Sequence, residues 1–300
     1  MRLGRYRLCF LFVFNILLGN NINIESHKHD SQYEEYTYKI CQQESEKLEK
    51  LFELENSQID ILLFNSHNEF KKICGLSRHI QGVLISSQNK IFLKTPTLTS
   101  TNYKEYRKLV IHELIHLYHN RKLGLNLFPD WFNEGIAEYF SGSFQLKQKI
   151  LLSKNIFTDN IPTLDKLINI EMKYNNRAAV KYIFSASIIE FLVVNYGDSV
   201  ISEILTAMQG TKDFQSSLET ITQLRYDVLT VYWKQYIKQK YSSLYFLDIQ
   251  YIIWLFLPFV FIFSLIVKLI QNQLTIRIWK YERFEEQINN IFTDPIIPGD

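Results

Sequence analysis

The chain has 300 residues, 47% of them hydrophobic and 21% charged, a composition that excludes an intrinsically disordered protein and suits one ordinary domain with flanking segments. Its 33 lysines and arginines nearly balance its 31 aspartates and glutamates, giving a formal net charge of +2. Nucleic-acid-binding domains usually carry a concentrated basic surface, so this balance gives no support for a nucleic-acid partner.

The first segment has the pattern of a secretory signal. Three arginines within residues 1–7 precede an almost wholly apolar run at residues 8–18. As a helix this run spans about 16 Å, too little for the ~30 Å core of a bilayer. A basic start before a short apolar run is typical of a signal peptide, and we expect one over residues 1–20. No small-residue cleavage pattern follows, so an uncleaved anchor is the alternative.

The next segments predict a small sheet followed by helices. Residues 20–33 are polar, which favours a loose segment, and residues 34–56 have the apolar spacing of a helix. Short apolar runs predict three strands, the last two flanking a turn-prone segment as in a hairpin, at residues 59–64, 83–85 and 91–93. Helices are expected at residues 102–121, 131–141, 178–196, 198–208 and 225–241. Strands followed by helices indicate an α+β domain, which we expect over residues 21–245.

The helix expected at residues 102–121 contains the sequence His112-Glu113-Leu-Ile-His116. Positions four apart share one face of a helix, so the two imidazoles can reach one metal ion. Catalytic zinc normally takes three protein ligands and a water, and neutral imidazole is a suitable ligand. Glu113 lies next to the first histidine and can accept the proton of that water. Taken alone, the motif also fits an amphipathic helix with two surface histidines.

A second motif, Trp131-Phe-Asn-Glu-Gly-Ile-Ala-Glu-Tyr139, resembles the W-x-N-E-G-x-A-x-Y helix of gluzincin metallopeptidases. The two motifs together resemble thermolysin-like and aminopeptidase-like gluzincins, and most closely the peptidase MA-like domains of bacterial proteins. The resemblance is strong over about 112–140 and fainter to about 240. It implies a zincin-like α+β fold, a small N-terminal sheet with a mainly helical C-terminal part. It also implies one Zn²⁺ per chain, with Glu134 as third ligand beside His112 and His116.

The activity that this resemblance implies is hydrolysis of peptide bonds by metal-activated water, with Glu113 as general base and a peptide or protein as substrate. The Gly-x-Met-Glu-Asn sequence of the aminopeptidases is absent upstream of His112, which favours an endopeptidase. The strand at residues 91–93 is a candidate to pair with an extended peptide. Two alternatives are a non-catalytic binding module braced by zinc, which has no need of Glu113, and a membrane scaffold or assembly factor.

Three further residues near the motifs are candidates for the site. Glu138 follows Glu134 by four residues, and the resemblance implies that it accepts the free N–H of a ligating histidine. Tyr182 begins the segment Tyr-Ile-Phe-Ser-Ala, which is similar to the Y-x-x-G-A segment of aminopeptidase-like gluzincins. The tyrosine of that segment donates to the substrate carbonyl oxygen, and core packing is the alternative role. His119 is expected behind a ligand or at the surface, because the metzincin pattern would need glycine at 119 and histidine at 122.

The remaining histidines and two cysteines give weaker signals. Cys41 and Cys74 lie in the expected exported domain, where they can either form a disulfide or stay as two buried thiols. Four histidines show no ligand spacing and are expected at the surface: His27, His29, His67 and His79.

A nearly continuous apolar run at residues 249–267 predicts one transmembrane helix. Its helical length is about 28 Å, which matches a single span, and a buried core helix is the alternative. Basic residues concentrate on the cytoplasmic side of membranes, and four of them follow the run: Lys268, Arg277, Lys280 and Arg283. We therefore expect an extracytoplasmic domain, periplasmic or at the cell surface, and a cytoplasmic tail at residues 268–300.

Overall fold

The structure is a computed structural model that describes residues 21–26, 31–168, 175–247 and 249–293. The expected signal segment at residues 1–20 lies outside the described residues. The chain divides into two compact units, Met1–Tyr245 and Phe246–Asp300, and each is described by itself. The first unit is mainly helical and contains one small sheet, as expected for an α+β domain.

Four strands form the sheet of the first unit. In spatial order they are β1 (Ile22–Ser26), β2 (Ile59–Phe64), β4 (Lys90–Lys94) and β3 (Gly82–Ile85). The first three run parallel, and β3 pairs antiparallel with β4. The three predicted strands and the hairpin formed by the last two are therefore confirmed.

Two predictions about this region are wrong. Of the segment 20–33 that was expected to be loose, the described residues are ordered: Ile22–Ser26 forms β1, which pairs in parallel with residues 59–63 of β2, and α2 begins at Ser31. The strand at residues 91–93 cannot accept a peptide, because β4 lies inside the sheet with β2 on one side and β3 on the other. The edge strand on this side of the sheet is β3.

Helices cover both faces of the sheet. On one face, α2 (Ser31–Phe52) and α5 (Tyr103–Lys122) pack over apolar side chains that include Ile61, Leu63 and Leu93. On the other face, α3 (His67–Cys74) contributes Phe70 to a smaller cluster with Phe64 and Phe92. A short turn of 3₁₀-helix, η1 (Ser86–Gln88), joins β3 to β4, and α4 (Pro96–Thr99) follows β4. Alternate side chains of β2 and β4 thus point to opposite faces of the sheet, and each face has its own apolar core.

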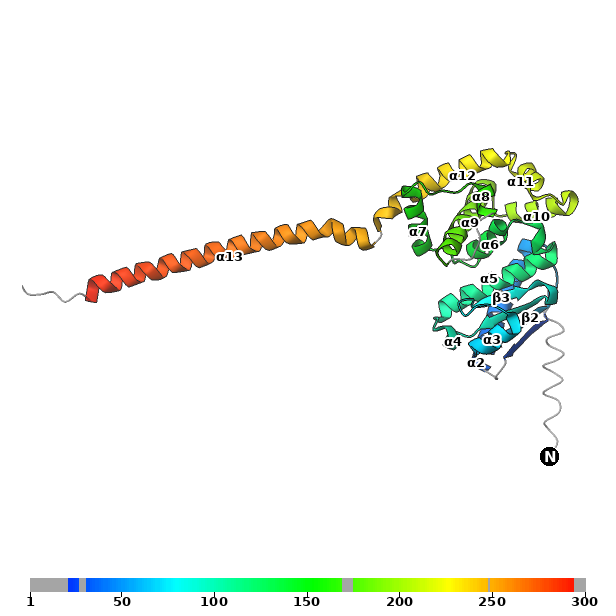
Figure 1. Cartoon of the computed structure of the whole chain (residues 1–300), viewed down its shortest axis with the longest axis horizontal. Coiled ribbons are helices and arrows are strands. Elements are labelled where there is room, and N and C mark those ends of the chain that lie inside the picture. The colour runs from blue at the N-terminus through cyan, green and yellow to red at the C-terminus, as the bar shows by residue number, and fades with distance from the viewer. Residues whose placement is uncertain (1–20, 27–30, 169–174, 248, 294–300) are drawn as a thin grey trace, which may run out of the picture. The chain divides into compact units, whose positions relative to one another are not determined.

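The remaining elements of the first unit are helical. Figure 1 shows α5 between the sheet and the helices α6 and α9. These elements are η2 (Leu125–Leu127), α6 (Asp130–Phe140), α7 (Leu146–Phe157), α8 (Leu164–Ile168), α9 (Asn175–Tyr196), α10 (Val200–Thr211), α11 (Phe214–Thr222), α12 (Tyr226–Tyr241) and η3 (Ser242–Leu247), the last crossing into the second unit. The six predicted helices correspond to α2, α5, α6, α9, α10 and α12. The helices α3, α4, α7, α8 and α11 were not predicted from the sequence.

The second unit consists mainly of α13 (Ile249–Thr293), a helix of 45 residues. It begins where the span at residues 249–267 was predicted, but it continues well beyond that segment. Two described helices are long and apolar enough to cross a membrane, α9 and α13. The apolar segment of α9 is 67% buried and belongs to the core of the first unit, whereas that of α13 is 0% buried. The strongly apolar α13 is therefore the candidate membrane span.

Cys41 and Cys74, the two cysteines among the described residues, are free thiols. Cys41 is buried in α2, and burial raises the pKa of its thiol to about 12. Cys74 ends α3 and is partly buried. Of the two arrangements that the sequence left open, the structure has the unpaired one.

Candidate metal centre

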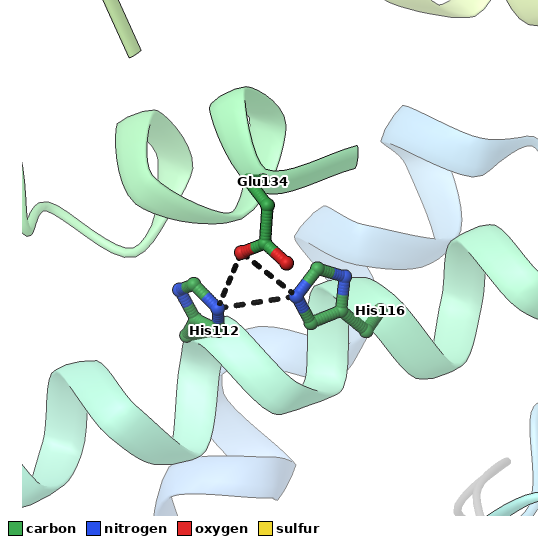
Figure 2. Close-up of side chains that lie close together, drawn as sticks. All are labelled: His112, His116 and Glu134. Atoms are coloured by element: carbon green, nitrogen blue, oxygen red, sulfur yellow. Dashed lines mark hydrogen bonds and ion pairs between the residues drawn. The ribbon is translucent and has the colours of Figure 1, made fainter. Parts of the chain in front are cut away.

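Two helices supply the group of described residues in the first unit that can hold a metal ion. The first is α5, whose first turn is capped by the side chain of Asn102, which accepts a hydrogen bond from Glu105 N at 2.9 Å. His112 and His116 lie one helical turn apart on the face of α5 that meets α6. The second helix is α6, from which Glu134 points back between the two rings (Figure 2).

The three donor atoms form a small triangle. The Nε2 atoms of His112 and His116 lie 3.1 Å apart, and Glu134 Oε2 lies 3.5 Å from the first and 3.7 Å from the second. In a tetrahedral zinc site with ligand distances of about 2.0–2.1 Å, neighbouring donors lie about 3.3 Å apart. The separations to Glu134 are longer than an ordinary hydrogen bond. The set therefore fits three ligands of one small cation better than a hydrogen-bonded cluster.

Burial and mutual attraction set the charges of this cluster. Burial works to lower the pKa of His112, but the carboxylate of Glu134 outweighs it and raises that pKa to about 9. Burial likewise works to raise the pKa of Glu134, but His112 and His116 outweigh it and hold that pKa well below its usual range. Glu134 is thus kept as a carboxylate, the form that can bind a cation.

Glu113 lies on the side of α5 that faces the sheet. Its side chain is buried, and burial raises its pKa, while the charges of His112 and His116 act in the opposite direction. The neighbouring strand is β3: a Cβ atom added to Gly82 would lie 3.0 Å from Glu113 Oε1, and the backbone of Leu84 lowers the pKa of the carboxyl group. Glu113 is therefore held between the metal centre and the edge strand.

Glu138 lies one turn beyond Glu134 on α6. Its Oε1 atom is 3.6 Å from Nδ1 of His112, the ring nitrogen that faces away from the triangle. Burial raises the pKa of Glu138, and the charge of His112 counteracts this. A carboxylate at this position favours the tautomer of His112 that carries its proton on Nδ1 and leaves Nε2 free for a metal.

Tyr182 lies on α9 near the same group of carboxylates. Burial raises the pKa of its hydroxyl, and the charges of Glu134, Glu138 and Glu113 raise it further. The hydroxyl therefore stays protonated and remains a hydrogen-bond donor close to the metal centre. The charges of the predicted site carboxylates therefore act on Tyr182.

His119 does not lie at the surface. Its side chain is fully buried, with its ring 4.4 Å from that of Phe128, 5.7 Å from Phe52 and 6.0 Å from Phe132, measured between centroids. Neither ring nitrogen has a hydrogen-bond partner in the described part of the chain. Burial lowers the pKa of His119 to about 3, so it is a neutral member of an aromatic cluster and the surface alternative is wrong.

The other residues of the second motif fix the position of α6. Asn133 donates from Nδ2 to the carbonyl oxygen of Leu125 at 3.0 Å, which ties α6 to η2. A Cβ atom on Gly135 would lie only 2.6 Å from the carbonyl oxygen of Ser185 and 2.8 Å from Ile189 Cγ1. Glycine is therefore required for α9 to approach α6 this closely. These contacts set the depth at which Glu134 enters the site.

Gly82 is a part of the site that was not predicted from the sequence. The available signal was a glycine at the start of the apolar run Gly-Val-Leu-Ile, which indicates close approach of another element. The identity of that element, α5, depends on a contact between residues about thirty positions apart.

The comparison with protein families places the chain in a known group. A family model described as the Peptidase MA superfamily matches residues 42–239, which is more than half of the chain and includes every candidate site residue. No curated protein matches the chain.

Proposed function

The chain belongs to the peptidase MA superfamily, and we propose that it is a zinc-dependent peptidase of the gluzincin type with a zincin-like fold. The observation that carries this proposal is the triangle of His112, His116 and Glu134, whose donor atoms all lie within 4.8 Å of one another. The position of Glu113 beside that triangle supports a catalytic site over a structural brace, because a brace needs no buried carboxyl group next to its ligands.

We propose distinct roles for the residues around the metal. Zinc, when bound, would lower the pKa of a coordinated water and polarise the carbonyl group of the substrate. Glu113 accepts the proton of the attacking water and passes it to the leaving amine. Tyr182 donates a hydrogen bond to the oxygen that becomes negative, and Glu138 keeps His112 in the tautomer that binds metal.

The edge strand supports an endopeptidase. β3 uses one side for β4, and its other side pairs with no strand that the structure describes. An extended peptide can add to such an edge through main-chain hydrogen bonds. Because a Cβ atom added to Gly82, the first residue of β3, would lie 3.0 Å from Glu113 Oε1, a peptide on β3 would pass close to the general base. This arrangement accepts residues on both sides of the cleaved bond.

For the location of the enzyme we propose a single-pass membrane protein with α13 as its span. The exposed apolar surface of α13 supports this assignment. The basic residues after residue 267 favour a cytoplasmic C-terminal side, and the signal-like residues 1–20 favour export of the first unit. The peptidase domain then lies outside the cytoplasm.

The decisive experiment compares Glu113→Gln with Glu134→Gln. Glutamine at 113 has the size of glutamate but cannot take a proton, so we expect full zinc content and a loss of peptidase activity of at least about 10²–10⁴-fold. Glutamine at 134 removes a charged ligand, so zinc affinity itself falls. Metal analysis and cleavage of a peptide library measure both effects. Undiminished cleavage by Glu113→Gln overturns the mechanism, and a wild-type protein that holds zinc but cleaves no peptide favours the binding module.

A further inference from the structure

A polar cavity lies beside α3, outside the metal centre. Its volume is about 810 Å³, within the range of ordinary ligand sites. Besides Leu98, its lining carries only polar or basic side chains: Asn65, Ser66, His67, Asn68, Lys71, Ser77, Arg78 and His79. The lining includes two permanent cations, two imidazoles and several hydroxyl or amide donors, and it includes no carboxylate.

The charge of this region is only partly balanced within the protein, because Lys90 pairs with Glu25 at 3.3 Å while the basic residues of the cavity have no such partner among the described residues. Residues 65–95 contain five lysines or arginines and a single acidic residue, Glu69, although the whole chain is nearly neutral. Neither Lys71 nor Arg78 forms an ion pair with any residue that the structure describes, which leaves both free for an external anion. Burial lowers the pKa of His67, and the positive charges of Arg78 and Lys94 lower it further.

The loop that carries Arg78 is held in place by a buried lysine. The side chain of Lys94 is fully buried and donates from Nζ to the carbonyl oxygen of Arg78 at 2.8 Å. Lys94 also lies over the ring of Phe70 on α3, 4.4 Å from its centroid. A turn closed by the hydrogen bond from Ile80 N to Ser77 O at 3.2 Å completes the loop. The cations of the cavity are therefore attached to a fixed backbone, which reduces the entropy lost when an anion binds.

The same loop leads directly into the edge strand. Gly82 begins β3 and lies against Glu113, and only three residues separate it from Arg78. Even fully extended, four residue steps cover only about 13 Å. A peptide paired with β3 and continued past Gly82 therefore reaches the cavity within about five residues of the bond that is cleaved.

We propose that this cavity is a specificity site that binds an acidic side chain of the peptide substrate, so that the enzyme prefers substrates with Asp or Glu within about five residues of the cleaved bond, on one side of it. The inference rests on the proposed peptidase function. The ligand is a carboxylate, and Arg78 and Lys71 supply the charge that recognises it. The amides at the start of α3 add to the attraction, because the first turn of a helix favours negative charge.

The test uses pairs of peptides that differ only by Glu or Gln, with the changed residue moved through five positions on each side of the cleaved bond. We expect kcat/KM to favour Glu about fivefold at positions on one side only. Arg78→Gln and Lys71→Gln reduce this ratio towards one. Lys72→Gln is the matched control, because Lys72 is a neighbouring lysine of α3 that does not line the cavity. Raising the salt concentration from about 0.05 M to 0.5 M also reduces the preference.

A second measurement separates this inference from the proposed function. The Glu113→Gln protein, loaded with zinc, is titrated with the fluorescently labelled Glu and Gln peptides, and anisotropy gives the two Kd values without any need for cleavage. We expect the Glu peptide to bind more tightly than the Gln peptide, and this difference to disappear in the Glu113→Gln, Arg78→Gln double variant. That result supports the site even if the wild type cleaves nothing. The inference is overturned if the Glu and Gln peptides behave alike at every position, or if the Arg78→Gln enzyme keeps the full preference for Glu. Inorganic phosphate that binds at Arg78 without competing with the Glu peptide also overturns it.

Discussion

Glu113 is buried and Glu134 is partly buried, and their surroundings favour different chemistry. Burial dominates at Glu113 and raises its pKa, whereas the two histidines dominate at Glu134 and lower its pKa. Neighbouring carboxyl groups with pKa values shifted apart are typical of sites where one group transfers protons and the other stays charged. The proposed division into base and ligand therefore agrees with the environment of each residue.

The motif residues could be predicted because their relations are local. His112 and His116 share a helix, as do Glu134 and Glu138, so helical spacing alone predicts which faces they occupy. Gly82 could not be predicted in the same way, because its role depends on the docking of β3 against α5. The aromatic environment of His119 was missed for the same reason, since Phe52 and Phe128 come from other elements.

At the residue scale we predict that Gly82→Ala lowers activity without removing zinc. The added Cβ would lie 2.7 Å from Leu93 Cδ2 and 3.0 Å from Glu113 Oε1, so the carboxyl group must move. A displacement of this kind costs about 10- to 100-fold in kcat. Gly210→Ala is the control, because a Cβ there meets open space. Unchanged kinetics in Gly82→Ala, or loss of zinc in that variant, would contradict the position that we assign to Glu113.

At the scale of elements, the sheet was predicted only in part. β2, β3 and β4 are short apolar runs that a sequence pattern can reveal. β1 alternates isoleucine with asparagine and glutamate, and its pairing with β2 joins residues 37 positions apart (22 and 59). Its pattern is weak because only Ile22 and Ile24 pack against the core. The internal position of β4 follows from pairing partners that local sequence does not encode.

The contact between α6 and α9 gives a prediction at this scale. Gly135→Ala places a methyl group against the backbone of Ser185, which cannot move as a flexible side chain can. We expect a loss of about 1–3 kcal/mol in the free energy of unfolding, or a decrease in Tm of roughly 2–4 °C for each kcal/mol in a domain of this size. Thermal unfolding of both chelated and zinc-loaded protein measures the effect.

The matched comparison is again Gly210→Ala in α10, which should be neutral or slightly stabilising because alanine is the better helix former. A Gly135→Ala protein as stable as the wild type would mean that α9 does not approach α6 as closely as the structure indicates.

For the whole molecule we predict that the first unit is accessible from outside the cytoplasm. Protease added to intact spheroplasts should digest it and spare an epitope placed at the C-terminus, because the positive residues after the apolar segment favour the cytoplasmic side. Permeabilised spheroplasts, in which both parts are digested, provide the control. If the epitope were digested and the first unit protected, the protein would have the opposite orientation to the one we predict.

The unbroken course of α13 has a mechanical consequence in the bilayer that we propose it spans. At 1.5 Å per residue its 45 residues extend for about 68 Å, more than twice the ~30 Å thickness of the hydrocarbon core. About half of the helix must therefore lie outside the lipid. Its one proline, Pro258, is within the apolar half. The half outside the lipid is thus continuous with the embedded half. When the embedded half tilts, the outer half swings with it as a lever, and the far end of the helix moves further than any point within the bilayer.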